Sequence, residues 1–398
     1  MRIGMMTDVY KPHVSGITNY ISLNKQYFEK AGHEVFIFTF GDLDYPDEET
    51  NVIRSPGLPL VDTGYYLNFR YNRKAKALLQ TMDLVHVNHP FLSGRLALRY
   101  CRPLHIPVVF TNHTRYDLYA QAYMPLLPEE ISVSFLQSYM PPFCSAVDLV
   151  ISPSPGMADV LRKLGVTSQM EVVPNGVELI RYQQACDDCR PEFGFKPEDI
   201  LLIYSGRLGP EKNVDFLLRA FAGVSEAVEN VHVLVIGGGP EEKDLKKLAA
   251  EIGVADQVHF YGMVAYDRMP QYLAMCNIFV TASVTEVHPL SVIEAMASGL
   301  PALGIHSVGV GDTIEDGRTG FLASQNQAAY AAKLTRLCLE PSLRRKMGLA
   351  ARKASEKYAV EHATQIMLAH YERLVFAALP RRRSLSSRIR SLVERLRT

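Results

Sequence analysis

Short apolar runs alternate with longer segments of helical spacing along most of the 398-residue chain. In the first half these runs occupy residues 3–6, 35–40, 84–87, 108–111 and 149–152. In the second half they occupy residues 201–204, 231–236, 258–261, 278–281 and 302–305. Short runs rich in valine, isoleucine and leucine are typical of strands that helices cover on both faces. The pattern therefore predicts βαβ units and mostly parallel sheets.

The two series of predicted strands are separated near the segment from Val173 to Val177. Each series is long enough for a domain of ordinary size, so we expect two doubly wound, Rossmann-like α/β domains. The predicted boundaries are residues 1–174 and 175–360, followed by a helix at 361–380 that returns toward the first domain and a tail at 381–398. Ligands of open parallel sheets bind beyond the carboxyl ends of the strands. A ligand cleft between two facing domains is therefore expected.

Bulk composition indicates a soluble globular protein, with 47% apolar and 21% charged residues. No run approaches the ~18 apolar residues of a membrane span, and the N-terminus enters a polar loop too early for a secretory signal. Six cysteines at irregular spacings favour reduced thiols and a cytoplasmic setting. The single CxxC motif, Cys186 to Cys189, lacks a second pair. It is interpreted as part of a polar loop in preference to a metal or redox site.

Charge is distributed unevenly although the 42 basic and 42 acidic residues cancel. Residues 381–398 contain seven arginines and one glutamate, a balance of +6, which leaves 35 basic and 41 acidic residues, or −6, for the rest. Leu385, Ile389, Leu392 and Leu396 form one apolar stripe of a helix in this tail. A basic amphipathic helix favours an anionic membrane surface, at roughly 1 kcal/mol per arginine. A frayed terminus or a helix packed on the body is the alternative, and nucleic acid is less favoured.

Two glutamates, Glu286 and Glu294, lie in the most informative segment, which runs from Thr285 to Pro301. Glu286 falls in a short loop after an apolar run at 276–282 that is predicted to be a buried strand. Glu294 lies on a helix that Pro289 can start and Gly299 can end. Carboxylates near a helix N-terminus suit a ligand with hydroxyls and a phosphate, since hydroxyls donate to carboxylates and phosphate binds free backbone N–H groups. The alternative is a surface glutamate and a helix glutamate in an ion pair.

A second motif runs from Leu201 to Asn213 as strand, loop and helix, with the helix beginning near Val214. Arg207 and Lys212 fall between the strand and the helix. Arginine offers a planar fork of donors for phosphate oxygens and lysine a compact charge, so the pair suits a diphosphate. Solvated surface charges are the alternative.

Together these segments resemble the family-4 glycosyltransferases, which have the GT-B fold and transfer a sugar from a nucleotide-sugar with retention at the anomeric carbon. The similarity extends over nearly the whole chain. It implies that Glu286 contacts the donor sugar, Glu294 the ribose, and Arg207 and Lys212 the diphosphate. The other donor-binding positions that the resemblance implies are Gly16, Gly206, Gly238, Met263, Val264, His288, Pro289 and Leu290.

His113 follows the predicted strand at 108–111 and is a further catalytic candidate. The resemblance places it beside the reacting sugar, whereas a lone histidine is otherwise more often structural. Tyr116, Tyr119 and Tyr123 line an acceptor path or simply pack. His86 and His89 end another strand without a metal-ligand spacing, so no metal is expected.

Two departures from the family pattern affect the expected contacts. Ser15–Gly16 stands where relatives usually have two glycines, which makes the first loop bulkier. Glu286–Val–His–Pro289 lacks the glycines that many relatives carry, so the exact donor-sugar contacts do not follow from the resemblance. This segment and the stretch from His113 to Tyr119 are more similar to the branch that glycosylates diacylglycerol.

The expected activity is a retaining, metal-independent transfer of a hexose from a UDP- or GDP-linked donor to a hydroxyl acceptor. Diacylglycerol is the leading acceptor, with phosphatidylinositol or a soluble polyol next, and an anionic membrane surface is the expected partner of the tail. The location that follows is cytoplasmic and peripheral to the inner face of the cell membrane. A sugar-nucleotide epimerase shares the fold and is the main alternative. A glycoside hydrolase that uses Glu286 and Glu294, and a non-catalytic membrane-binding protein, are weaker ones.

Overall fold

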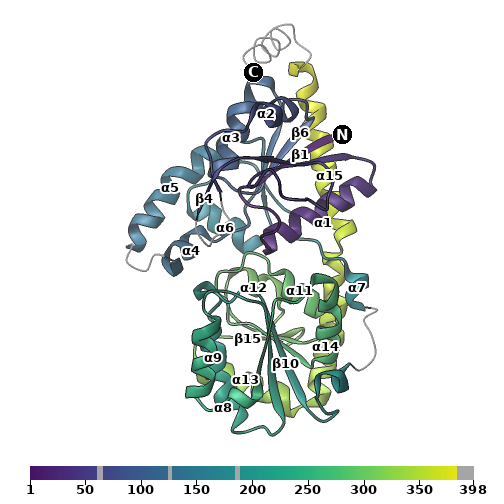
Figure 1. Cartoon of the computed structure of the whole chain (residues 1–398). Helices are drawn as coiled ribbons and strands as arrows, with labels where there is room; N and C mark the ends of the chain where they lie inside the picture. Colours follow the sequence, from purple (N-terminus) through teal and green to yellow (C-terminus); the bar gives the residue numbers. More distant parts are fainter. Residues whose placement is uncertain (61–65, 124–127, 184–188, 383–398) are drawn as a thin grey trace. The chain divides into compact units, whose positions relative to one another are not determined.

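The computed structural model describes residues 1–60, 66–123, 128–183 and 189–382, drawn in colour in Figure 1. The predicted stripe of the basic tail, Leu385 to Leu396, lies outside these residues, as does Cys186. The chain divides into two compact units. The first contains Met1–His113, Val133–Gly176 and the chain from Val360 onward, and the second contains Thr114–Ser132 and Val177–Ala359. The predicted boundaries had assigned 114–132 to the first domain.

The first unit is built on a parallel sheet of seven strands in the order β3-β2-β1-β6-β7-β8-β9. The strands are β1 (Arg2–Met6), β2 (Glu34–Phe40), β3 (Val52–Ser55), β6 (Leu84–Val87), β7 (Val108–Thr111), β8 (Leu149–Ser152) and β9 (Met170–Val172). β4 (Leu58–Pro59) and β5 (Tyr66–Leu67) form a separate antiparallel pair. The helices are α1 (Gly16–Lys30), α2 (Arg73–Leu79), α3 (Leu92–Cys101), α5 (Glu129–Ala146, which begins in the second unit), α6 (Pro155–Lys163) and α15 (Val360–Arg382). β3, β4, β5 and β9 were not predicted, because their short sequences lack a continuous apolar run.

The second unit contains a six-stranded parallel sheet in the order β12-β11-β10-β13-β14-β15. Its strands are β10 (Ile200–Ser205), β11 (Val231–Ile236), β12 (Val258–Gly262), β13 (Ile278–Val280), β14 (Ala302–Ile305) and β15 (Gly320–Ala323). Its helices are α4 (Tyr116–Tyr123), α7 (Leu179–Gln183), α8 (Val214–Ser225), α9 (Glu242–Glu251), α10 (Met269–Met275), α11 (Leu290–Ala297), α12 (Val308–Thr313), α13 (Gln327–Leu339) and α14 (Pro341–Ser355). Two doubly wound parallel domains are therefore confirmed. The run at 276–282 was predicted as a longer strand than β13, which is shortened because Cys276 ends α10 and Ser283 N–H bonds back to Thr281 Oγ1.

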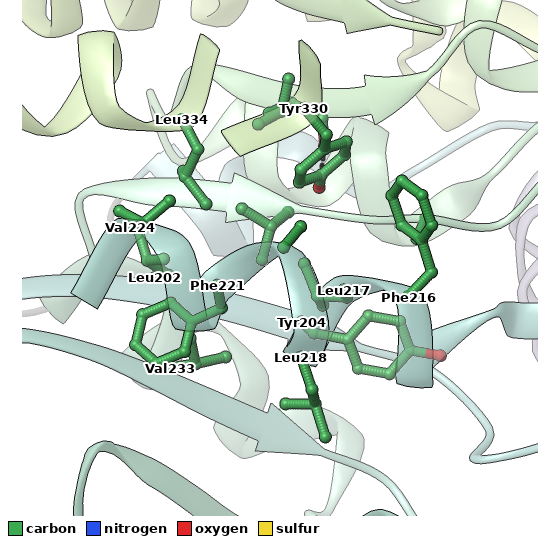
Figure 2. Close-up of a cluster of buried hydrophobic side chains, with 14 of the residues drawn as sticks. Leu202, Tyr204, Phe216, Leu217, Leu218, Phe221, Val224, Val233, Tyr330 and Leu334 are labelled. Carbon is green, nitrogen blue, oxygen red and sulfur yellow. Dashed lines mark hydrogen bonds between the residues drawn. The ribbon is translucent and has the colours of Figure 1, made fainter. Parts of the chain in front are cut away.

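Side chains of α8 form much of a hydrophobic core in the second unit (Figure 2). This core lies next to the loop 206–213, which connects β10 to α8. Leu217, Phe221 and Val224 recur at helical spacing and belong to one buried cluster with Tyr204 of β10 and Tyr330 of α13. Complete burial of a large side chain such as Phe221 stabilises the fold by roughly 1.5–3 kcal/mol. The loop between β10 and α8 is thus attached at both ends to a well-packed base.

The last described turn of α15 is held to the first unit. The Arg382 guanidinium donates to the carbonyl oxygens of Met82 and Asp83, at 3.0 and 3.1 Å. The first residues of the predicted tail, 381–382, are therefore the end of α15. Within the described ranges, no helix has both the length and the apolar character needed to cross a bilayer.

Candidate active site

The strand order of each sheet reverses at one place, and ligands of doubly wound sheets bind beyond the carboxyl ends of the strands at that place. In the second sheet β10 lies between β11 and β13. The loops that leave β10 and β13 contain residues 206–213 and 281–289. These two loops carry both predicted cations and Glu286, so the topology places them at one edge of the second sheet.

Lys212 and Glu286 form an ion pair at this edge, with Lys212 Nζ 2.6 Å from Glu286 Oε1. Burial acts to raise the pKa of Glu286, but Lys212 and the Ser283 hydroxyl hold it below its usual value. Burial likewise acts to lower the pKa of Lys212, but Glu286 raises it above its usual value. Both groups are therefore ionised at neutral pH. Glu286 thus pairs with Lys212, whereas Glu294 accepts a hydrogen bond from Tyr266.

Arg207 lies at the start of the same loop and its side chain is exposed. Its backbone is fixed, because Tyr204 Oη donates to the Arg207 carbonyl oxygen at 2.9 Å. Its guanidinium carbon lies 6.0 Å from the centre of the Tyr123 ring, within the range of a cation–π contact. Arg207 therefore presents a solvent-accessible charge in the loop that also carries Lys212.

The glycine cluster after β11 packs against the loop of Arg207. A Cβ on Gly237 would lie 1.9 Å from the Gly206 carbonyl oxygen, and a Cβ on Gly239 would lie 2.3 Å from the Leu208 carbonyl oxygen. Gly237 also has φ +127°. Only glycine fits at these two positions, so the cluster lets two loop backbones meet. Sequence reasoning singled out Gly238, where a side chain would meet only ordinary contacts.

Gly238 and Met263 are neighbours, since a Cβ on Gly238 would lie 3.5 Å from Met263 Cγ. The Met263 side chain is 63% exposed, whereas Val264 packs against the core around α10 and α11. Gly262, with φ +66°, turns the chain between β12 and these residues. The predicted contacts of Gly238, Met263 and Val264 with a nucleotide stay predictions.

α11 begins at this edge without a side-chain cap. Pro289 occupies the N-cap position and Leu290 is the first helical residue. The first-turn N–H groups of an α-helix have no intrahelical partners, so they can bind oxygen atoms of a ligand. His288 is buried and its ring packs edge-on against Tyr358 at 4.9 Å. Burial, together with Lys357, lowers the pKa of His288 to about 3, so it is neutral.

Glu294 is only 7% exposed, and Tyr266 Oη donates to its Oε1 at 3.1 Å. Burial raises the pKa of this carboxyl from 4.5 to about 7, although the Tyr182 and Tyr266 hydroxyls act to lower it. A polar surrounding for a helix glutamate was expected. The two tyrosines that supply it were not identified, because α7 and the turn before α10 carry no motif that points to Glu294.

The loop of Glu286 is supported from α12. The Gly309 N–H donates to the Glu286 carbonyl oxygen at 3.0 Å. A Cβ on Gly309 would lie 2.6 Å from the same oxygen, so glycine is required for this approach. Gly309 was not among the predicted site residues. Its only signal in the sequence is the glycine-rich start of α12.

The first unit holds His113 just after β7. Its Nε2 lies 3.0 Å from Asn88 Oδ1, and its ring packs edge-on against Tyr20 at 4.5 Å. Burial, with His86 and His89, lowers the pKa of His113 well below its usual value. The imidazole is therefore neutral, with Nε2–H donated to Asn88 and Nδ1 carrying the lone pair. Its predicted position beside a reacting sugar stays a prediction, as does the cleft.

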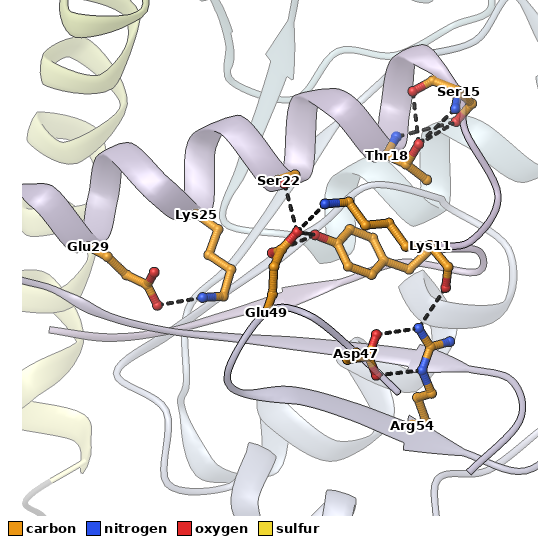
Figure 3. A network of polar contacts seen from close by, with 10 residues as sticks. Lys11, Ser15, Thr18, Ser22, Lys25, Glu29, Asp47, Glu49 and Arg54 are labelled. Atoms are coloured by element: carbon orange, nitrogen blue, oxygen red, sulfur yellow. Dashed lines mark hydrogen bonds and ion pairs between the residues drawn. The ribbon is translucent and has the colours of Figure 1, made fainter. Parts of the chain in front are cut away.

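The loop between β1 and α1 ends in a capping box. The Ser15 hydroxyl accepts from the Thr18 N–H, and Thr18 Oγ1 accepts from the Ser15 N–H at 2.7 Å. The serine that replaces a usual glycine thus has its side chain engaged in the helix cap (Figure 3). A Cβ on Gly16 would meet no atom within 4 Å. The backbone of Gly16 is therefore free for a ligand to approach closely.

The same loop is tied to the segment after β2, as Figure 3 shows. Glu49 accepts hydrogen bonds from Tyr10 Oη, Lys11 Nζ and the Ser22 hydroxyl. The carboxylate of Glu49 therefore restrains the loop before α1.

His86 and His89 are part of the first unit's polar core. His86 bonds to Thr111 Oγ1 at 2.7 Å and to the Tyr371 hydroxyl, and His89 Nδ1 lies 3.2 Å from Thr7 Oγ1. Across the residues that the structure covers, no group of three or more His, Cys, Asp or Glu side chains is arranged to hold a metal ion.

Comparison with known proteins assigns the chain to a family. Residues 14–181 match the family profile described as Glycosyltransferase Family 4, and residues 187–354 match Glycosyl transferases group 1. A relative from Streptococcus pneumoniae, named alpha-monoglucosyldiacylglycerol synthase, is 32% identical over 354 residues, which cover 86% of this chain and 80% of that protein. The chain belongs to the family-4 glycosyltransferases.

Other relatives of this glycosyltransferase carry related names. An alpha-monoglucosyldiacylglycerol synthase from Acholeplasma laidlawii is 26% identical over 82% of this chain and 86% of its own length. The D-inositol 3-phosphate glycosyltransferase of Streptomyces avermitilis is 30% identical over 73% of this chain and 67% of its own. The chain therefore lies near the diacylglycerol glucosyltransferase branch.

Solved structures agree with the fold of a family-4 glycosyltransferase. Sucrose-phosphate synthase from Thermosynechococcus elongatus superposes with a TM-score of 0.80 at 21% identity, covering 94% of this chain and 99% of that one. HepE of Anabaena, solved with UDP and glucose, gives 0.75 at 19% identity with the same coverage. The enzyme is a GT-B glycosyltransferase that uses a nucleotide-sugar donor.

Proposed function

We propose that this glycosyltransferase moves a hexose, with retention at the anomeric carbon, from a UDP- or GDP-linked donor to the hydroxyl of a membrane lipid, diacylglycerol being the leading acceptor. The observation that carries the proposal is the Lys212–Glu286 pair at the carboxyl end of the second sheet. In this pair Lys212 supplies a positive charge suited to a diphosphate, and Glu286 supplies a carboxylate suited to sugar hydroxyls. The two residues come from the neighbouring loops after β10 and β13. Two relatives named alpha-monoglucosyldiacylglycerol synthase support the lipid acceptor and the glucose donor.

In this proposal the donor diphosphate binds Arg207, Lys212 and the first-turn N–H groups of α11. Arg207 and Lys212 stabilise the charge that develops as the bond between the anomeric carbon and the phosphate oxygen breaks. Lys212 is already ionised and is held in place by Glu286, so its side chain needs little rearrangement during the reaction. A positioned charge of this kind contributes on the order of 10²-fold or more to the rate.

Glu286 accepts from hydroxyls of the sugar and Glu294 from hydroxyls of the ribose. Glu286 is suited to this because its pKa is held low, so it is an acceptor at every physiological pH. His113, which is neutral, supports the anomeric region through Nδ1. The acceptor oxygen bonds to the anomeric carbon on the face that the phosphate leaves, and the departing phosphate oxygen takes the acceptor proton. No side chain is required as a nucleophile.

A screen of UDP- and GDP-hexoses against diacylglycerol, phosphatidylinositol and soluble polyols, with mass detection of the product, tests the substrate assignment. We expect a glucosyl lipid from UDP-glucose and diacylglycerol. The anomeric configuration of the product, read by NMR, tests retention. Conversion of the donor to another sugar nucleotide without any acceptor would instead establish the epimerase. Release of a sugar from a glycoside without a nucleotide would favour the hydrolase.

Peripheral association with the inner face of the cell membrane belongs to the same proposal and rests on the seven arginines of residues 381–398. Deletion of residues 383–398 is the suitable variant, because it leaves the Arg382 contacts with Met82 and Asp83 intact. The full chain should sediment with anionic liposomes, and less with neutral ones, whereas the shortened chain should remain in the supernatant. Equal sedimentation of both chains would remove the tail from the proposal.

A further inference from the structure

A segment from the first half of the chain packs with the second unit. Residues 114–132 group with Val177–Ala359, and α4 within this segment contacts the short helix Pro210–Lys212 of the loop 206–213. Tyr123, the last residue of α4, donates its phenol proton to Glu211 Oε2 at 2.8 Å. Tyr123 also stacks on Tyr119 at 5.8 Å. Two of the three tyrosines that the sequence associated with an acceptor path, Tyr119 and Tyr123, thus lie against the loop of Arg207 and Lys212.

Glu211 is an unusual residue for an anion-binding loop. It is an acid between two cations, Arg207 and Lys212, and it is only 3% exposed. Its carbonyl oxygen accepts from Thr285 Oγ1 at 3.1 Å, which anchors its backbone. Its Oε1 is buried without a hydrogen-bond partner in the part of the chain that the structure describes. The phenol of Tyr123 is therefore the one donor to this carboxylate within those residues.

The contact between Tyr123 and Glu211 also explains Gly209. Gly209 has an extended backbone, with φ −125°, that any residue can adopt. A Cβ at this position would lie 2.4 Å from Glu211 Oε2 and 3.0 Å from Tyr123 Oη. A side chain at position 209 would therefore displace the Glu211–Tyr123 pair, although the backbone itself would accept any residue.

Four charged side chains of the site act electrostatically on the phenol of Tyr119 in α4. Burial is the main cause that raises the pKa of Tyr119, and Lys212 and Arg207 act to lower it while Glu211 and Glu286 act to raise it. All four charged groups therefore lie within electrostatic reach of α4. Two positive and two negative charges balance before any ligand binds.

We propose that Tyr123 is a positioning residue of the diphosphate site, which holds the Glu211 carboxylate away from Arg207 and Lys212 so that those cations remain available to a nucleoside diphosphate. A buried carboxylate without a donor is costly, and an ion pair with Arg207 or Lys212 of its own loop would relieve that cost. Such an intramolecular carboxylate competes with the ligand at a high effective concentration. This inference rests on the proposed role of Arg207 and Lys212 in binding the donor.

The test is the affinity for UDP and GDP by calorimetry, together with steady-state kinetics, for four variants of the full chain. Tyr123→Phe removes the donor and should weaken nucleoside diphosphate binding and raise the donor KM by roughly tenfold, the scale of one hydrogen bond to a charged group. Gly209→Ala displaces the pair without removing a polar group and should act in the same direction. Glu211→Gln removes the competing charge and should bind the nucleotide at least as tightly as the unmodified enzyme.

The decisive variant is Tyr123→Phe combined with Glu211→Gln. Because the neutral amide does not compete for the cations, the tenfold loss should shrink to about twofold or less in this background. A merely structural role for Tyr123 would give the same loss in both backgrounds, which would overturn the inference. Tyr71→Phe, which removes a buried phenol hydrogen bond to the Phe38 carbonyl oxygen in the first unit, controls for general loss of stability.

The outcomes separate this inference from the proposed function. If the unmodified enzyme binds neither UDP nor GDP, the proposed function fails and the inference fails with it. If it binds one of them and Tyr123→Phe binds it equally well, only the inference is overturned. Should Tyr123→Phe fold poorly, as judged by thermal unfolding against Tyr71→Phe, the comparison of Glu211→Gln with Gly209→Ala decides the matter. The inference then requires that, relative to the unmodified enzyme, Glu211→Gln binds the nucleoside diphosphate equally or more tightly. It also requires that Gly209→Ala binds it more weakly.

Discussion

Ionisation of Glu294 should make nucleotide binding depend on pH near neutrality. Burial raises the pKa of this carboxyl from 4.5 to about 7 in the free enzyme. In the proposed function, ribose hydroxyls donate to the ionised carboxylate, so binding of the donor should favour loss of the proton and return the pKa toward its usual value. Protonation therefore competes with binding below pH 7 and hardly at all above pH 8.

The size of the effect follows from the pKa. With a free-enzyme value of about 7, the apparent dissociation constant is multiplied by a factor of about 1.1 at pH 8 and about 11 at pH 6. Affinity should thus fall about tenfold over these two units, or about 1.4 kcal/mol. The stability of the free enzyme should change in the opposite direction. A raised carboxyl pKa means that the native state binds the proton more tightly, so the unfolding free energy falls by about 1.4 kcal/mol from pH 6 to pH 8.

Calorimetric titration with UDP at pH 6, 7 and 8 measures the first effect. The phosphate of the ligand titrates near pH 6, so the Glu294→Gln variant, which cannot ionise, serves as the control for the ligand's own protonation. The difference between the two proteins should show the tenfold dependence, and urea unfolding at the same pH values should show the opposite trend. A pH dependence that is identical in the two proteins would refute the assignment of Glu294 to the ribose.

Three further predictions concern the loop 206–213 and the glycine cluster that packs against it. Arg207→Ala should lower kcat by on the order of 10²-fold with an unchanged urea midpoint, because the side chain is exposed; a near-normal rate would contradict its role. Lys212→Met should lower the unfolding free energy by about 3 kcal/mol, since it leaves the Glu286 carboxylate without its cation, and a Lys212→Met/Glu286→Gln double variant should recover part of this loss in urea unfolding. Gly237→Ala should cost at least ~2 kcal/mol by the same measurement, because of its positive φ and the contact with the Gly206 carbonyl; Gly238→Ala is the tolerated control.

Much of the fold could be predicted from the sequence because the information is local. A strand buried on both faces needs a continuous apolar run, and β6, β7, β8, β11 and β14 have the predicted limits to the residue. The start of α8 at Val214 and the end of α11 before Gly299 were also correct, since capping and turn residues act within a few positions. The cations of the 206–212 loop and the two glutamates were predicted as donor-binding residues for the same reason, and their roles stay predictions.

The tertiary structure decided which residues from distant segments contact one another. Only the packed chain pairs Lys212 with Glu286, and only burial beside Tyr266 moves the pKa of Glu294 to about 7. The sequence likewise contains no sign that α4 packs against the loop 206–213, or that a side chain at position 209 would displace the Glu211–Tyr123 pair. The types of residue and their local spacing determined which groups could bind a nucleotide-sugar. Their charge states and partners depend on desolvation and on contacts across the sheet, which exist only once the chain has folded.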